Sequence, residues 1–176
     1  MKKLLGEARR QEILLLLKQS SEPITGTDLS KKAGVSRQVI VGDMTLLKAR
    51  NEPILATSQG YVYIGKTNTM HAFERQIACI HSPEDAKAEL YTLVDSGVLV
   101  KNVTIEHPVY GDLIASIQVA NRHEVDLFLK KVEETGASYL SELTGGIHLH
   151  LIAASNEETI NRAIYAMRER GFLAEE

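Results

Sequence analysis

The sequence contains no tryptophan and a single cysteine, Cys79, among its 176 residues. One cysteine excludes an internal disulfide, and so few cysteines are typical of proteins from a reducing compartment. Long apolar runs are also missing: the most hydrophobic stretches extend over a few residues, whereas a membrane-spanning helix needs about 20. Charged residues interrupt the first segment, MKKLLGEARRQE, which excludes the apolar core of a signal peptide. We therefore expect a cytoplasmic protein that does not enter a membrane.

Charge is distributed unevenly along the chain, whose net charge is −3. Residues 1–66 contain 11 lysines and arginines against 6 acidic residues, which gives a net charge of +5. Residues 67–176 contain 9 basic and 17 acidic residues, which gives −8. This split indicates two domains, residues 1–66 and residues 71–176, with the polar segment KTNTM as the linker. The basic domain is suited to a polyanion such as DNA.

Helical periodicity dominates the first domain. Apolar residues recur at helical spacing in GEARRQEILLLLKQS, in a short segment that Thr25 or Thr27 can cap, and in VIVGDMTLLKAR after the N-cap Ser36. Two short strand-like segments, residues 54–56 and 61–64, then flank a Ser-Gln-Gly turn. Three helices followed by a hairpin are the order of a winged helix–turn–helix domain.

The third helix of this domain carries the candidate DNA-reading side chains. In helix–turn–helix proteins the N-terminal half of this helix enters the major groove, where arginine reads guanine and glutamine reads adenine. We predict contacts to double-stranded operator DNA from Ser36, Arg37, Gln38, Val41 and Thr45. The alternative is a domain that mediates only protein contacts. DNA binding is favoured because the capped helix, the hairpin and the positive charge agree.

Strands and helices alternate in the second domain. Changes of hydrophobic period and clear helix caps give the order strand, helix, two strands joined by PVYG, helix, strand, helix. This βαββαβα order predicts an α+β, ferredoxin-like fold, which is an antiparallel sheet with helices on one face. In that topology the first strand, which ends at His81, neighbours the fourth strand, IHLHLIAA.

The fourth strand carries His148 and His150 on one face, because residues two apart in a strand point to the same side. Two neutral imidazoles at this spacing can chelate one divalent metal ion, although a His-x-His pair alone is a weak motif. The alternating apolar residues are expected to face the helices. With this orientation of the strand, the imidazoles would lie on the open face of the sheet or against a second copy of the chain. Cys79 is expected to be a buried strand residue and not a ligand.

The segments CIHSPEDAKAEL, IEHPVYG and GGIHLHLIAA resemble the three-histidine (3H) domain, and the first domain is similar to the winged-helix half of the same proteins. That family consists of nicotinic-acid-responsive transcriptional repressors of NAD biosynthesis and niacin uptake genes. The resemblance covers nearly the whole chain. It implies a divalent transition metal (Zn, Ni, Fe or Co) held by His81, Glu89, His148 and His150. It also makes His107 a candidate for effector recognition.

The expected function is a metal-containing repressor that binds operator DNA with nicotinic acid as corepressor. A homodimer is expected because a two-fold protein reads a palindromic operator, and the exposed edge and face of the C-terminal sheet are the expected dimer surface. Rival interpretations are a metal-sensing repressor without organic effector, a metal-dependent hydrolase and a biotin-type ligase. We expect no enzyme, since the sequence lacks a glycine-rich phosphate loop and a nucleophile motif.

Overall fold

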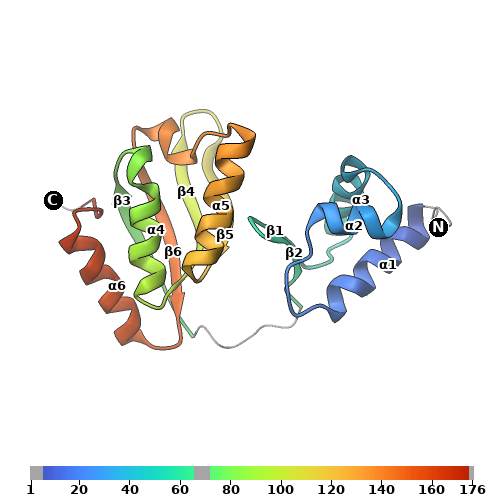
Figure 1. The fold of residues 1–176 in the computed structure, drawn as a ribbon, viewed down its shortest axis with the longest axis horizontal. Coiled ribbons are helices and arrows are strands. Elements are labelled where there is room, and N and C mark those ends of the chain that lie inside the picture. The colour runs from blue at the N-terminus through green and yellow to red at the C-terminus, as the bar shows by residue number, and fades with distance from the viewer. Residues whose placement is uncertain (1–5, 66–71, 175–176) are drawn as a thin grey trace. The chain divides into compact units, whose positions relative to one another are not determined.

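The computed structural model describes residues 6–65 and 72–174, so the predicted linker lies outside the described residues. The chain divides into two compact units, residues 1–67 and 68–176 (Figure 1). Each unit has its own hydrophobic core. Within the described residues, no helix is both long enough and apolar enough to cross a membrane.

The N-terminal unit folds as the predicted three helices and hairpin. Thr25 and Ser36 cap the second and third helices, because each hydroxyl accepts a hydrogen bond from the backbone N–H three residues later. Gly34, at φ +65°, ends the second helix and makes the tight turn into the third. The elements are α1 (Gly6–Gln19), α2 (Gly26–Ala33), α3 (Arg37–Ala49), β1 (Ile54–Thr57) and β2 (Gly60–Tyr63).

The hairpin of this unit is attached to the segment that precedes α2. Ile24 and Tyr61 exchange two backbone hydrogen bonds of 3.0 and 2.8 Å. Gly60 makes this approach possible: a side chain there would overlap with the backbone of Ile24, and its φ of +138° is strained for other residues. The base of this hairpin, which is the wing of the domain, is therefore fixed to the helix–turn–helix unit.

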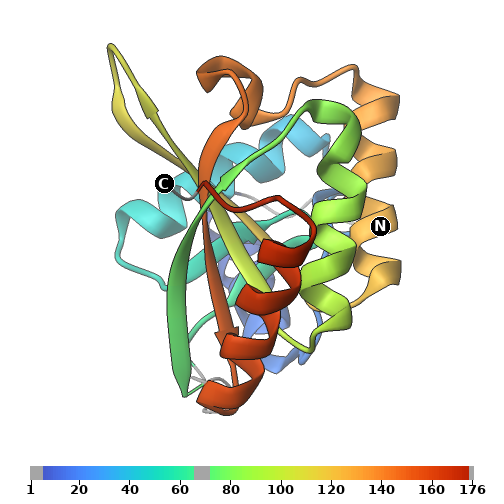
Figure 2. The same cartoon turned by 90° about the vertical axis from the view of Figure 1, so that its left-hand side faces the viewer.

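The C-terminal unit is an antiparallel four-stranded sheet whose helices α4, α5 and α6 cover one face (Figure 2). This confirms the predicted α+β class and element order. The elements are β3 (Phe73–Ile80), the 3₁₀ turn η1 (Pro83–Asp85), α4 (Ala86–Asp95), β4 (Leu99–His107), β5 (Gly111–Val119), α5 (Arg122–Thr135), the 3₁₀ turn η2 (Leu140–Thr144), β6 (Ile147–Ala154) and α6 (Glu157–Glu169).

The strand order of the sheet is β3-β6-β4-β5. The first and fourth strands are neighbours, as expected for a split βαβ arrangement. The fourth and second strands hold the centre, whereas the ferredoxin-like order places the first and third strands there. The composition of β6 accounts for its central position, because its last residues, Ile152, Ala153 and Ala154, are at most 1% exposed.

Two extensions flank the sheet. The C-terminal segment runs along the outer edge of β3, where Ile80 N–H donates to the carbonyl of Phe172 and Ala174 N–H donates to that of Ala78. At the other edge, the β4–β5 hairpin projects beyond its neighbours (Figure 2), and Val109 and Tyr110 at its tip are highly exposed. The last residue of β4 that pairs with β6 is Thr104.

Candidate metal centre and DNA-reading surface

Four ionisable side chains meet at one end of the C-terminal sheet. His81 directly follows β3, Glu89 lies in the first turn of α4, and His148 and His150 lie on β6. In the antiparallel register of β3 and β6, Cys79 lies opposite His148, which brings His81 beside the histidine pair. Each of the four side chains is only 2–4% exposed. The structure thus gathers all four residues that the resemblance implies.

The two faces of β6 are the reverse of the expected ones. His148 and His150 point toward the helices and are buried, whereas Ile147 on the opposite face is 54% exposed. The reason lies further along the strand. Ile152 and Ala154 share the histidine face and belong to the core under the helices, so they fix the register. His148 and His150 lie on the same face and are therefore also buried, where Glu89 is their polar partner.

Three imidazole rings contact the carboxylate of Glu89. The Nε2 atoms of His81 and His150 lie 2.8 and 3.3 Å from Glu89 Oε2, and Nε2 of His148 lies 2.9 Å from Oε1. The spacing of α4 alone left the direction of Glu89 open. In the structure its side chain points at the sheet and is buried.

The other nitrogen of each ring is bound to the backbone. The Nδ1 atoms of His81, His148 and His150 lie 2.7, 2.9 and 2.7 Å from three carbonyl oxygens, and a carbonyl can only accept a hydrogen bond. Each Nδ1 therefore carries a proton, which leaves a lone pair on each Nε2 when the ring is neutral. Metal-ligating histidines have this arrangement, because the outer hydrogen bond fixes the tautomer and the ring orientation.

The electrostatics of the cluster call for a positive charge at its centre. Burial opposes ionisation of His81 and His150, yet the Glu89 carboxylate raises the pKa of both rings above its ordinary value. Burial would raise the pKa of Glu89, but the three imidazoles hold it well below its usual range. Neutral rings would leave lone pairs facing carboxylate oxygens, so either protons or a cation must lie between them. Three imidazole nitrogens and one carboxylate suit Zn, Ni, Fe or Co.

Two residues that the sequence analysis did not single out position the histidines. Gly146, at φ +97°, accepts from His148 through its carbonyl, and a side chain there would overlap with the carbonyl oxygen of His81. The carbonyl of Asn102, at a bulge of β4, accepts from His150, and its Oδ1 accepts from the N–H of Leu151. The only hint in the sequence is the Gly-Gly pair that immediately precedes the His-x-His strand.

In the N-terminal unit, the predicted DNA-reading residues lie on the outer face of α3. Ser36, Arg37, Gln38 and Thr45 are exposed, and Val41 is half-buried. A hollow between the end of α2 and the start of α3 is lined by Lys31 and the Ser36 cap, among others. This geometry permits phosphate contacts at the turn and base contacts along the first half of α3.

A buried ion-pair network holds α3 against α1. Asp43 on α3 is 2% exposed; Arg9 Nε lies 2.6 Å from its Oδ2 and Arg10 Nη1 lies 3.2 Å from its Oδ1. Glu7 pairs with Arg10 and also with Arg50, at 2.7 and 2.8 Å. Three arginines that contribute to the charge of +5 are therefore engaged in ion pairs within the domain. Its positive potential toward DNA rests on the remaining basic residues.

Comparison with known proteins assigns each unit to a known type of domain. Residues 74–176 match the 3H domain and residues 9–62 match an HTH domain. The chain belongs to the family of HTH–3H transcription repressors. It is 56% identical over 172 residues to the transcription repressor NadR of Bacillus subtilis strain 168, covering 97% of this chain and 96% of that protein. It is 38% identical over 174 residues to the probable transcription repressor NiaR of Thermotoga maritima, covering 99% and 98%.

These matches confirm the family indicated by the resemblance and the prediction of a transcription repressor that is not an enzyme. Both relatives span almost the whole chain and carry the name of a repressor. The hydrolase and ligase interpretations therefore have no support from the relatives. The helix–turn–helix unit is an HTH domain, whose established partner is DNA.

Within the 3H domain, His107 lies apart from the four-residue cluster. It ends β4, three residues after the last pair with β6, at the sheet end where β6 begins. Its Nδ1 accepts hydrogen bonds from the N–H groups of Val109 and Tyr110, at 3.1 and 3.3 Å, and its ring lies against the Tyr110 ring. His107 thus stabilises the turn, and its Nε2 carries the proton when the ring is neutral.

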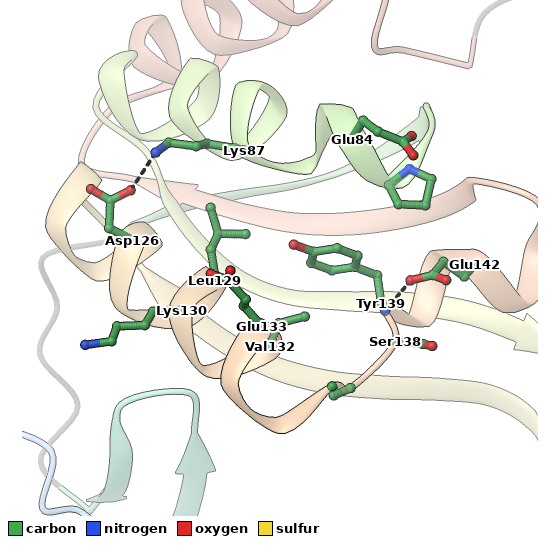
Figure 3. A pocket seen from close by; sticks show the side chains of 13 residues that line it. Glu84, Lys87, Asp126, Leu129, Lys130, Val132, Glu133, Ser138, Tyr139 and Glu142 are labelled. Atoms are coloured by element: carbon green, nitrogen blue, oxygen red, sulfur yellow. Dashed lines mark hydrogen bonds and ion pairs between the residues drawn. The ribbon is translucent and has the colours of Figure 1, made fainter.

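A groove of about 950 Å³ on the 3H domain lies between α4, α5 and η2 (Figure 3). Its two lysines are already paired: Lys87 lies 3.3 Å from Asp126, and Lys130 lies 3.6 Å from Glu134. Further carboxylates at Glu84, Glu133 and Glu142 line it. This surplus of negative charge makes the groove unfavourable for an anion such as nicotinate.

Proposed function

We propose that the protein is a metal-containing, nicotinic-acid-responsive repressor of NAD biosynthesis and niacin uptake genes. It acts in the cytoplasm, binds operator DNA through α3, and uses nicotinic acid as corepressor. The observation that carries this proposal is the convergence of three imidazole Nε2 atoms on the buried Glu89, inside the 3H domain of an HTH repressor. The resemblance supplies the identity of the effector.

The donor set defines the ion and its role. His81, Glu89, His148 and His150 would hold a divalent transition metal, and each ring is already oriented by its backbone carbonyl. When bound, such an ion supplies a Lewis acid that can take the pyridine nitrogen or the carboxylate of nicotinic acid. The residues of the chain bury the site and fix the orientation of the rings.

His107 is the proposed second contact of the effector. Because its Nδ1 accepts two backbone N–H groups, its Nε2–H is free to donate to a carboxylate oxygen. The residue is half-buried and stands at the sheet end where the cluster lies. A hydrogen bond from this position would distinguish nicotinic acid from the uncharged nicotinamide.

A homodimer formed through the open face of the sheet is part of the proposal. Ile80 and Ile147 are direct neighbours across β3 and β6, and both lie on the face without helices together with Ile114 of β5. Their exposures are 42%, 54% and 64%. Exposed apolar residues gathered on one face are typical of an interface. Two copies joined in this way would present two α3 helices to a palindromic operator.

The effector experiment uses calorimetry on the metal-loaded protein with nicotinate, nicotinamide and quinolinate side by side. We expect saturable heat with nicotinate and much weaker binding of the other two. The nicotinate affinity of His107→Ala should fall about 10-fold or more, as for loss of a charge-assisted hydrogen bond. Equal, weak heats for all three compounds would remove nicotinic acid as the effector.

The DNA experiment uses an operator selected from a random duplex library with the metal- and nicotinate-loaded protein. Arg37→Ala and Gln38→Ala should weaken specific binding, and affinity should fall steeply as salt rises. Titration with metal alone and with metal plus nicotinate tests the second candidate, a metal sensor without organic effector, which the same cluster could serve. If nicotinate adds nothing to operator binding, that candidate replaces the proposal.

A further inference from the structure

The only cysteine of the chain lies beside the histidine–glutamate cluster. Cys79 is fully buried on β3, directly opposite His148. Its Sγ, a carboxylate oxygen of Glu89 and a ring nitrogen of His148 all lie within 4.8 Å of one another. Two ligands of one ion can be at most about 4.5 Å apart, because bonds to zinc are about 2.0–2.3 Å long. The thiol is therefore within a small shift of shared coordination.

An independent observation favours a cation at this point. Nε2 of His81 belongs to a side chain that is 4% exposed, and it has no hydrogen-bond partner of acceptable geometry in the described residues. It lies 2.8 Å from Glu89 Oε2, but its direction does not suit a hydrogen bond to that oxygen. A buried lone pair without a donor is unfavourable, whereas a metal ion satisfies it.

We infer that Cys79 is a further ligand of this metal ion and binds it as a thiolate, together with Glu89 and the imidazoles. The inference rests on the proposed metal site and adds sulfur to its ligands. Charge balance supports it. Three neutral imidazoles and Glu89 leave a divalent ion with a net charge of +1 in a buried site, and one thiolate makes the site neutral.

The proton balance of this step is defined. Burial and the neighbouring Glu89 charge raise the pKa of the Cys79 thiol, so the thiol is neutral in the metal-free protein. On coordination the S–H bond breaks, a metal–sulfur bond forms and the proton leaves to the solvent, with no change of oxidation state. A thiolate among imidazoles favours Zn, Ni, Co and Fe over Mg and Ca.

The test is a titration of the full-length, metal-free protein with cobalt(II), followed by absorption spectroscopy. Visible d–d bands report that the ion is bound, and a thiolate-to-cobalt charge-transfer band in the near ultraviolet reports sulfur. We expect both bands to saturate at one ion per chain. Since the chain has one cysteine, the charge-transfer band can be assigned to Cys79. In a weakly buffered solution, wild type should release one proton more per ion than Cys79→Ser.

The wild-type spectrum decides the question even where a variant fails to fold. Visible bands without the charge-transfer band would overturn the role of Cys79 and leave the four-residue site intact. Absence of both bands would overturn the metal site itself. Cys79→Ser and Cys79→Ala should keep the visible bands and lose the near-ultraviolet one, with weaker cobalt affinity. His148→Ala, the matched control, should bind cobalt at least 10-fold more weakly than either Cys79 variant.

Discussion

Among the residues that the structure describes, each unit of this repressor buries one carboxylate, and the two carboxylates have different partners. Asp43 of the HTH domain and Glu89 of the 3H domain are 2% and 3% exposed. Asp43 contacts two arginines, which carry a permanent positive charge and hydrogen-bond donors. Glu89 contacts three imidazoles, whose only remaining protons point away toward backbone carbonyls. The carboxylate of the first site is thus compensated by permanent charges, whereas that of the second requires protons or a metal ion.

The difference shows that the residue type paired with a buried carboxylate decides whether the site is purely structural or can respond to its surroundings. A guanidinium cannot lose its proton in a protein, so the network around Asp43 remains the same at any physiological pH or metal concentration. An imidazole exchanges its proton near neutral pH, so the cluster around Glu89 can change its contents. The ion pairs of the HTH domain thus keep their charges, whereas the cluster of the 3H domain can gain or lose protons or a metal ion. Four experiments on the two units follow, from the largest expected effect to the smallest.

Asp43→Asn should produce the largest loss of stability. It leaves the Arg9 and Arg10 charges partly uncompensated between α1 and α3, and breaking a buried pair in this way costs about 3–5 kcal/mol. We expect the lower end, because Arg10 keeps Glu7 as a partner. Urea unfolding measures the effect, and Glu7→Gln is the control for an exposed pair. A change no greater than that of the control would show that the network is not structural.

Glu89→Gln should leave the metal-free protein folded and remove most of its metal affinity. The glutamine amide can donate hydrogen bonds to two of the three Nε2 lone pairs, so the metal-free 3H domain should stay folded. Losing a ligating carboxylate should weaken metal binding by more than about 100-fold, the upper end of the loss seen for outer-shell partners. Competition with a chromophoric chelator measures this. Unchanged affinity would contradict the proposed ligand set.

The pH dependence of stability should reverse when metal is added. The pKa values of His81 and His150 are raised in the folded protein, so their stabilising charge is present below the ordinary histidine value of about 6.5. It is lost as pH rises through the folded values. The melting temperature of the metal-free protein should therefore fall by a few degrees between about pH 6 and 8. The metal-loaded protein should show the opposite trend, because protons compete with the ion.

Two glycine-to-alanine substitutions should give small effects of opposite sign. Gly42 lies within α3 with open space around its Cα, so Gly42→Ala should stabilise the HTH domain by about 0.5–1 kcal/mol. Gly136 ends α5 at φ +63°, so Gly136→Ala should destabilise the 3H domain by a similar amount. Thermal unfolding measures both. Weaker operator binding by the Gly42 variant would show that DNA approaches the backbone of α3.

The parts of the structure that depend on local rules could be predicted from the sequence. Thr25 and Ser36 cap α2 and α3 through their hydroxyl groups, as predicted. These features need only a few neighbouring residues to form. The strand order could not be predicted in the same way. It depends on contacts between strands far apart in the sequence, which decide the strand that lies at the buried centre of the sheet.

The candidate site shows where local reasoning ends. Alternation of the apolar residues suggested that the imidazoles face away from the helices, because it gave no weight to Ile152 further along β6. Periodicity left Glu89 undetermined, and nothing marked Asp43 as buried, since charged residues are inside only when a partner meets them. The resemblance supplied Glu89. The carbonyl contacts of Gly146 and Asn102 appear only in three dimensions.

The C-terminal segment along the edge of β3 has a practical consequence. Its Phe172 ring lies edge-on against the His81 ring, with centroids 5.7 Å apart, and the side chain is 8% exposed. Since the chain has no tryptophan, Phe172→Trp would introduce a single indole next to the cluster. Quenching of its indole emission by cobalt or nickel would let occupancy be followed in real time, in solution, while the same molecule binds or leaves its operator.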